Sequence, residues 1–385
     1  MNSNTKSLFR PHNIIYFTTL LSFGFWLFPD FGIFRKGFSE GFSIFSKGFF
    51  IAVLWYMSAL LFALIGFTLG IQIKIKNKAI DRFVNFENKT PYHIITLLTF
   101  FGLIFTCLKI YESLGRDLVN IFTLIITGYA NQLKYALYEN YKPGILSLRY
   151  VAILSCTVAL VRRIILKKKS RLDFFNFLSL LVIAIISSRL SIIITFISFA
   201  VIYVNYNGFK IGFKRGILIA ILGFHLLALL NYTRNSNFYK DMGLGFYGAG
   251  ISEIITYLGA PFQGAVAVGN NTDLIRKQPA NRMLYAHIEE SLTTNSSFLE
   301  LFILYDWYCF LYMAISLLIL SFLAGVFSKN ESNYLFLLYT VLLYGFAEFW
   351  RLFWFGNGIV FTLIIAVLLT IILTILLRSL PIWKK

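Results

Sequence analysis

The chain has 385 residues, of which 58% are hydrophobic and only 14% are charged, and its mean hydropathy is +0.73. A soluble globular domain is excluded, because it would expose far too much apolar surface to water. The formal charge of +18 does not indicate a nucleic-acid partner, because Lys and Arg mark the cytoplasmic loops of membrane proteins. Repeated apolar runs of about 20 residues predict an all-α polytopic membrane protein.

Taken in chain order, the apolar runs predict about ten transmembrane helices within one integral membrane domain, residues 1–385. The first run follows Lys6 and Arg10 without a small-residue cleavage site, so we expect a retained anchor and not a signal peptide. With both termini in the cytoplasm, the two densest basic clusters, KIKNK and RRIILKKKSR, lie on the cytoplasmic side. The predicted spans are residues 12–29, 49–72, 93–112, 146–166, 172–188, 190–207, 216–231, 300–325, 333–350 and 358–378.

Two predicted outer loops are long. The segment from Glu112 to Gly144 repeats apolar residues at three and four, which favours an interfacial amphipathic helix. Residues 232–299, between spans 7 and 8, form the larger loop, which we expect to be the extracytoplasmic catalytic and substrate-binding segment. It contains a predicted buried helix, ISEIITYLGAPFQGAVAVGN, broken at Pro261, and a second helix-compatible stretch, NRMLYAHIEESL.

The stretch IISSRLSIII, residues 185–194, places one arginine inside a long apolar run. The run from Leu172 to Asn207 would measure about 54 Å as one helix, whereas the hydrocarbon core is about 30 Å thick. The sequence therefore predicts a hairpin of two short helices that turns at Ser187, Ser188 and Arg189. Arg189 either reaches the interface to cap this turn, or binds an anion such as phosphate in a cavity between helices.

Further arginines fall on the predicted outer side, against the positive-inside trend. They are Arg234, Arg276, Arg282 and Arg351. Each one alone is typical of a solvated loop. As a set they indicate an anionic ligand, and the phosphate of a lipid carrier is a ligand that enters such a protein from the bilayer.

With these features the chain resembles the Wzy-type oligosaccharide repeat-unit polymerases, which are relatives of the O-antigen ligases. The resemblance covers the ten-span plan, the Ser188-Arg189 turn, the large late outer loop and its segment TYLGAPF, residues 256–262. It extends to a following span that opens with Asp306 and ends near Gly325. The family usually has Asp-Phe-Gly and a further glycine where this chain has Asp306-Trp-Tyr, so that correspondence is loose.

The resemblance implies a GT-C-like fold in the bacterial cytoplasmic (inner) membrane. It implies a glycosyltransferase that polymerises undecaprenyl-diphosphate-linked repeat units into O-antigen or capsular polysaccharide on the outer face. The partners would be the lipid-linked glycan donor and acceptor, the membrane lipids and a chain-length regulator protein.

Such a reaction needs cations for the departing diphosphate and a base for the acceptor hydroxyl. We assign Arg189 and Arg234 to the diphosphate first, and Arg276, Arg282 and Arg351 second. No D-x-D or E-x-x-H occurs on the outer side, and Cys107, Cys156 and Cys309 show no zinc spacing, so we expect a metal-independent enzyme without a cofactor. Candidates for the base are His287, Glu290 and Asp306, followed by Glu289 and Asp241.

Two of these candidates, His287 and Glu290, would share one face if NRMLYAHIEESL is a helix. The alternative interpretation, without a catalytic role, is that these residues lie at a solvated helix end. His225 lies inside the seventh predicted span, where a hydrogen bond between helices is expected.

Other functions are compatible with the same pattern. A ligase-like enzyme would move glycan from the same carrier to a lipid or a protein. A transporter of lipid-linked sugars would show two similar halves with paired broken helices, and the sequence shows no such symmetry. A non-catalytic membrane scaffold would give no reason for Arg189.

Overall fold

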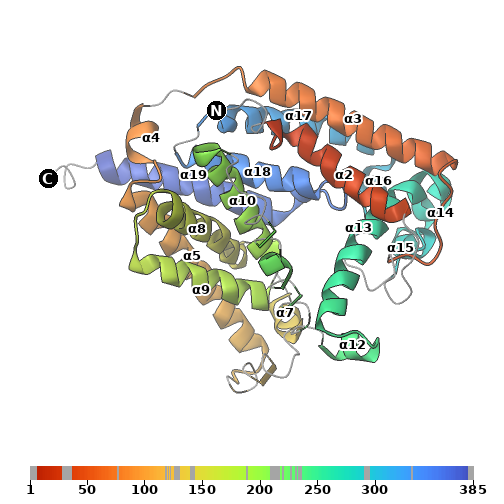
Figure 1. Ribbon diagram of the computed structural model, residues 1–385, viewed down its shortest axis with the longest axis horizontal. Coiled ribbons are helices and arrows are strands. Elements are labelled where there is room, and N and C mark those ends of the chain that lie inside the picture. The colour runs from red at the N-terminus through yellow and green to blue at the C-terminus, as the bar shows by residue number, and fades with distance from the viewer. Residues whose placement is uncertain are drawn as a thin grey trace.

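The protein is a bundle of helices (Figure 1). The predicted all-α class is confirmed, and over the described ranges the chain forms no strand, only isolated β-bridges. The computed structural model describes residues 7–27, 37–75, 78–117, 119, 121, 123–124, 131–138, 144–187, 190–208, 217–218, 221–225, 228–229, 232, 236–289, 295–330 and 333–379.

Among the described residues, six helical segments are long and apolar enough to cross a membrane. They are α3 (Lys47–Gly70), α5 (Lys89–Ser113), α10 (Leu190–Asn207), α13 (Phe246–Asn270), α16 to α17 (Ser297–Ser328) and α19 (Gly358–Ser379). Five of them coincide with predicted spans, so a membrane protein is supported. The sixth, α13, lies inside the predicted outer loop.

Four more predicted spans are apolar helices of fewer than 18 residues. They are α2 (Pro11–Leu27), α8 (Val151–Leu160) with its π-helical continuation η2 (Val161–Ile165), α9 (Arg171–Ile186) and α18 (Leu335–Glu348). The predicted seventh span, 216–231, is described only in part. The count of ten spans therefore stays a prediction.

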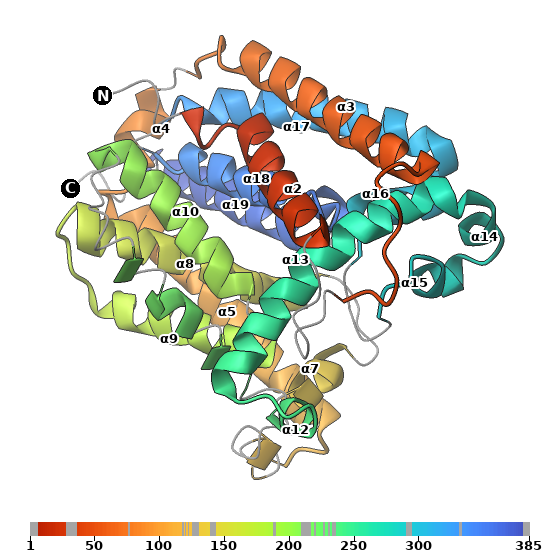
Figure 2. The same cartoon turned by 45° about the vertical axis from the view of Figure 1, so that its right-hand side comes forward.

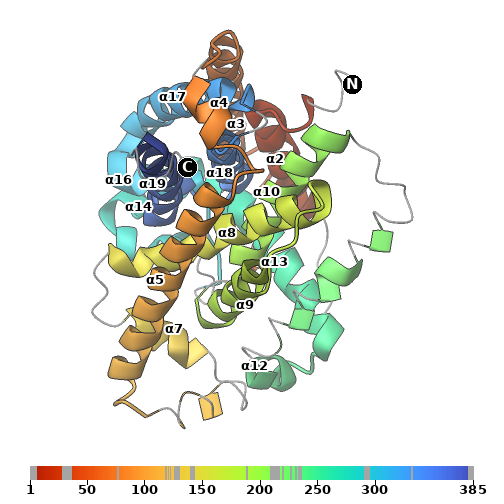
Figure 3. The same ribbon diagram turned by 90° about the vertical axis from the view of Figure 1, so that its left-hand side faces the viewer.

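The run from Leu172 to Asn207 is divided into two contacting helices, as predicted, and residues 188–189 of the predicted turn lie outside the described residues. The helix α9 opens with a capping box at Ser170 and ends at the cap residue Ser187, and α10 begins at Leu190. The two helices measure about 24 and 27 Å at 1.5 Å per residue, so each is slightly shorter than a typical hydrocarbon core. They pack with α5 and α8 in one group (Figure 3).

The helix α13 runs without interruption from Phe246 to Asn270, so the predicted break at Pro261 is wrong. A proline removes one backbone N–H and leaves carbonyls of the preceding turn short of partners. Here Ser22 of α2 donates a hydrogen bond to the carbonyl of Leu258 at 2.7 Å. A hydroxyl from a neighbouring helix is one of the contacts that allow a proline inside an apolar helix.

The helices α3 and α17 (Cys309–Ser328) run parallel and approach each other closely through glycines (Figure 2). A Cβ atom added to Gly66 would lie 2.3 Å from the carbonyl oxygen of Leu318, and one added to Gly70 would lie 2.0 Å from that of Phe322. Gly325 on α17 faces the end of α3 in the same way, 2.7 Å from the Phe67 carbonyl oxygen. Small residues allow the backbones of membrane helices to meet.

The basic segment RRIILKKKSR lies at one end of the bundle, called here the basic end (Figure 1). Arg162 of η2 donates to the carbonyls of Phe86, Glu87 and Asn88 at 2.7, 3.0 and 3.1 Å, and Lys168 pairs with the Glu87 carboxylate at 3.1 Å. These contacts bring RRIILKKKSR beside the segment that follows α4 (Lys78–Phe83). The short helices that follow α13 lie at the opposite end, where α3 and α17 begin (Figure 1).

Candidate functional site

The connection from α13 to α16 (Ser297–Tyr305) folds over the end of the bundle opposite the basic end. It carries α14 (Thr272–Lys277), η3 (Pro279–Asn281) and α15 (Arg282–Tyr285). It is fastened to the start of α3, because Asn270 accepts a hydrogen bond from the Gly48 N–H at 2.8 Å and donates one to the Ser46 hydroxyl at 3.1 Å. This connection brings several predicted site residues together.

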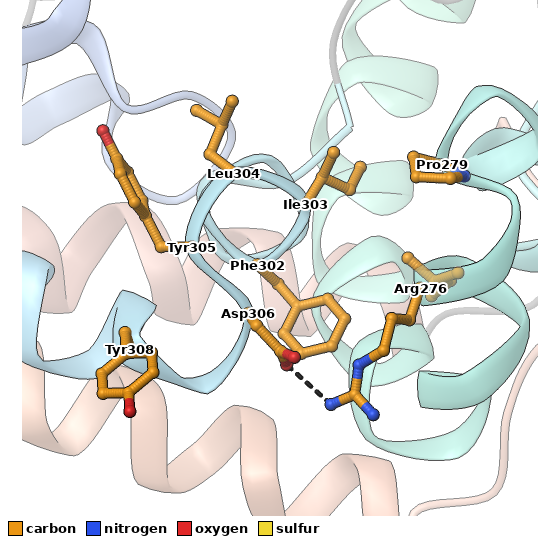
Figure 4. A pocket seen from close by; sticks show the side chains of 9 residues that line it. Arg276, Pro279, Phe302, Ile303, Leu304, Tyr305, Asp306 and Tyr308 are labelled. Atoms are coloured by element: carbon orange, nitrogen blue, oxygen red, sulfur yellow. Dashed lines mark hydrogen bonds and ion pairs between the residues drawn. The ribbon is translucent and has the colours of Figure 1, made fainter.

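Arg276 and Asp306 form an ion pair with 2.8 Å between Nη2 and Oδ1 (Figure 4). Both side chains remain accessible, at 46% and 44% of their surface. The hydrogen bond with Asp306 raises the pKa of Arg276 above its ordinary value. The sequence assigned Arg276 to the diphosphate and Asp306 to the base, and the structure places the two side by side.

Asp306 has an unusual backbone for a residue with a side chain, with φ 51° and ψ −142°. It ends α16 and opens the short η4 (Asp306–Tyr308), and its carboxylate also accepts the Trp307 N–H at 2.8 Å. Non-glycine residues in such sparsely populated conformations cluster at functional sites. The turn therefore directs the carboxylate toward α14.

A pocket of about 370 Å³ lies beside this ion pair. Phe302 and Ile303 supply apolar walls, while Tyr305 and Tyr308 lie beyond Asp306 (Figure 4). Aromatic faces next to a guanidinium and a carboxylate can stack on a sugar ring and hydrogen-bond its hydroxyls. The same guanidinium can bind phosphate oxygens.

Arg351 is buried, and its guanidinium is held by the carboxylate of Glu348 one turn earlier. The Tyr344 hydroxyl donates to the other carboxylate oxygen at 2.7 Å, and Tyr257 of α13 lies 5.6 Å below the guanidinium. Burial lowers the pKa of Arg351, and the charge of Glu348 more than offsets this and holds it above the ordinary value. Arg351 is thus an internal ion-pair partner, unlike the accessible Arg276.

Glu300 of α16 lies within Coulombic range of Arg282 and Arg351 and accepts a long hydrogen bond of 3.4 Å from the Phe353 N–H. Neither Glu300 nor Glu348 was predicted as a site residue. Both could have been identified from the sequence as candidate site residues, because each is an ionisable residue in an otherwise apolar run. Glu348 also lies three residues before Arg351, which is ion-pair spacing on a helix.

His287 does not lie on a helix, so the predicted shared helix face with Glu290 is wrong. The helix α15 ends at Tyr285, and His287 has φ 58°. A backbone hydrogen bond to a distant segment explains why the helix does not continue, since the His287 carbonyl accepts the Ser39 N–H at 2.8 Å. The ring lies 5.1 Å from that of Phe42, and Nδ1 is 3.7 Å from the Glu40 carboxylate.

Gln263 of α13 connects α2, the segment around Glu40 and the segment around His287 from within the protein. It is fully buried, accepts the Trp26 indole N–H at 2.7 Å, and donates to the carbonyls of Glu40 and Ala286 at 2.7 and 3.2 Å. The backbone around His287 is therefore fixed by an amide that no sequence motif singled out.

Another buried arginine, Arg149, lies beside Ser187, the cap residue of α9. It donates to the hydroxyls of Ser187, Tyr138 and Tyr150, each at 3.1 Å, and its guanidinium lies 4.4 Å from the Tyr150 ring. Arg149 lies within the predicted span 146–166 and was not among the predicted site residues. Its contacts tie α9 to η1 (Ile145–Tyr150) and α7 (Asn131–Tyr138).

Three predicted site residues, Arg189, Arg234 and Glu290, lie outside the described residues. Of the lesser candidates, Glu289 is exposed, and Asp241 is the last residue of α12 (Ser236–Asp241). His225 lies 3.2 Å from the Tyr247 hydroxyl of α13, which confirms the expected hydrogen bond between helices.

Within the described part of the chain, no group of three or more His, Cys, Asp or Glu residues is arranged to hold a metal ion. The chemistry available at the pocket is that of a guanidinium, a carboxylate and two phenols. Comparisons with protein-family models, with curated proteins and with solved structures find no match to the chain.

Proposed function

We propose that the protein is a membrane glycosyltransferase that polymerises oligosaccharide repeat units carried on undecaprenyl diphosphate. The observation that supports this proposal most directly is the accessible Arg276–Asp306 ion pair. It lies beside a pocket with tyrosines, at the end of the bundle opposite the basic end. The Wzy-type sequence features support the same proposal.

In the proposed reaction the acceptor hydroxyl attacks the anomeric carbon of the donor glycan. A new C–O bond forms to the acceptor, the bond to the lipid diphosphate breaks, and the hydroxyl proton passes to a base. Arg276 would exchange its bond to Asp306 for diphosphate oxygens, because a guanidinium suits phosphate geometry. Asp306, released from Arg276, would accept the proton.

The charge distribution supports an orientation. Basic residues favour the cytoplasmic side, so the basic end would face the cytoplasm and the Arg276–Asp306 pocket would face outward. In a bacterium this is the outer face of the cytoplasmic membrane. A lipid-linked donor would reach the pocket laterally from that leaflet, and a chain-length regulator would act on the same face.

The test is reconstitution of the purified protein in liposomes with a synthetic lipid-diphosphate repeat unit. We expect a ladder of chain lengths on a gel. Arg276→Ala and Asp306→Asn should each lower the rate at least a hundredfold, whereas Lys277→Ala, which removes the neighbouring exposed cation, should change it less than threefold. EDTA should not inhibit.

Three other outcomes would contradict the proposed site or the proposed reaction. Wild-type rates from both pocket variants would remove the pocket from the reaction. Transfer of single glycans to a lipid or protein acceptor without self-elongation would replace the polymerase with the ligase relative. Movement of the lipid-linked unit between leaflets without any new glycosidic bond would identify a transporter.

A further inference from the structure

A second cavity lies at the basic end, far along the helices from the Arg276–Asp306 pocket. It has a volume of about 170 Å³ and is formed where the start of α2 meets the ends of α3, α10 and α17 and the start of α18. Its polar lining comes from Arg10, Asn205, Ser328 and Lys329. Four helices and the segment that precedes α2 thus line one small chamber near the helix ends, which is the level of lipid headgroups.

The lining of this cavity is positively charged. It includes two cations, Arg10 and Lys329, and no carboxylate. Within the described part of the chain, neither cation forms an ion pair, although Arg162, Arg276 and Arg351 all have polar partners there. Asn205 adds an amide that can donate to an anion.

The remaining walls are apolar. Phe67 and Ile71 come from α3, Val201 and Val204 from α10, and Phe336 from α18. The Tyr339 hydroxyl of α18 donates to the Phe9 carbonyl at 2.7 Å, which holds the segment before α2 against the cavity and fixes the position of Arg10. The chamber therefore combines two cations with hydrocarbon surface.

We infer that this cavity binds the phosphate of an anionic phospholipid, such as phosphatidylglycerol, from the leaflet at the basic end. Basic pockets between transmembrane helices are suited to acidic headgroups. The volume admits a phosphate and part of a glycerol but not acyl chains, which stay outside against the exposed apolar helix faces. The site does not depend on the proposed glycosyl transfer, because it shares no residue with the Arg276–Asp306 pocket.

The experiment uses the full-length protein purified in a neutral detergent. Phosphatidylglycerol, phosphatidylcholine and inorganic phosphate are titrated separately, and binding is followed by native mass spectrometry and by the midpoint of thermal unfolding. We expect phosphatidylglycerol alone to bind saturably and raise the midpoint. The double variant Arg10→Gln/Lys329→Gln should lose at least tenfold in affinity, whereas Lys74→Gln, an exposed cation near the end of α3, should bind as wild type.

Equal binding of phosphatidylcholine, or undiminished phosphatidylglycerol binding by the double variant, overturns the inference. Saturation by inorganic phosphate at the same concentrations would replace the lipid with a free anion and overturn it too. If the double variant does not fold, the exposed Lys329→Gln change alone decides, with at least a threefold loss of affinity expected. Glycosyl transfer is not part of this readout, so failure here leaves the proposed enzyme untouched.

Discussion

At the residue scale, the candidate site is marked by backbone conformations that side chains rarely adopt. Asp306 and His287 both have positive φ, at 51° and 58°, and each was a predicted base. Such conformations cost about 1–3 kcal/mol and persist only where surrounding contacts enforce them. For His287 those contacts are the Ser39 N–H and the buried Gln263.

Replacing His287 by glycine separates strain from chemistry. Glycine adopts positive φ without steric cost, so His287→Gly should stabilise the fold by about 1 kcal/mol, measured as a higher thermal unfolding midpoint. Polymerisation should stay within threefold of wild type, because the proposed reaction uses Arg276 and Asp306.

The matched control is Lys167→Gly, since Lys167 has φ 56° at the basic end. It should give a similar gain in stability and leave activity unchanged. A hundredfold loss of activity in His287→Gly with normal activity in Lys167→Gly would move proton transfer from Asp306 to the histidine ring.

The residues of the site were predictable to different degrees. Arg276 and Asp306 could be selected by residue type and predicted side, but their contact joins α14 to η4 and depends on how the loop folds. The pairing of Arg351 with Glu348 was local and could have been read from their spacing. The contact of His287 with Glu40 joins distant parts of the chain, so no local pattern could indicate it.

At the scale of single elements, the length of the apolar runs predicted the helices well, whereas the residues taken as signals of helix breaks and helix ends predicted them poorly. The hairpin of α9 and α10 followed from length alone, because one helix would have been too long for the bilayer. The break at Pro261 failed because tertiary contacts, including that of Ser22 with the Leu258 carbonyl, sustain the helix. The helix-compatible stretch NRMLYAHIEESL is helical only as far as Tyr285, because the chain near His287 pairs with residues 37–39 instead.

The α3–α17 interface should be intolerant of a single added methyl group. In Gly66→Ala the new Cβ would meet the Leu318 carbonyl oxygen, so we expect a loss of about 1–3 kcal/mol from overpacking, seen as a lower unfolding midpoint and less monodisperse protein in detergent. Gly24→Ala on α2 is the control, because nothing lies within 4 Å of its added Cβ. A destabilisation of equal size in both variants would contradict the close packing.

At the scale of the whole molecule, the two ends of the bundle differ in chemistry. One end holds Arg162, Lys168 and the cavity lined by Arg10 and Lys329, and the other holds the Arg276–Asp306 pocket. The sequence predicted this separation through the positive-inside rule. It did not predict that α13, assigned to an outer loop, is as long as a membrane-crossing helix.

The orientation can be measured with an impermeant maleimide on intact cells. Lys277→Cys, next to the pocket, should be labelled from outside, whereas Lys169→Cys should be labelled only after permeabilisation. Both positions are exposed, and the unsubstituted chain reports labelling of its native cysteines. The reverse pattern would place the basic end outside and turn the proposed active site toward the cytoplasm.

The glycine contacts between α3 and α17 have a mechanical consequence. Backbones this close at Gly66, Gly70 and Gly325 cannot slide along each other without collision, so we expect α3 and α17 to behave as one rigid unit. Asp306 and Tyr308 precede α17, and Lys329 follows it, about 30 Å away along the axis. A lipid headgroup bound at one end of α17 and a sugar bound at the other end would therefore contact the same rigid pair of helices.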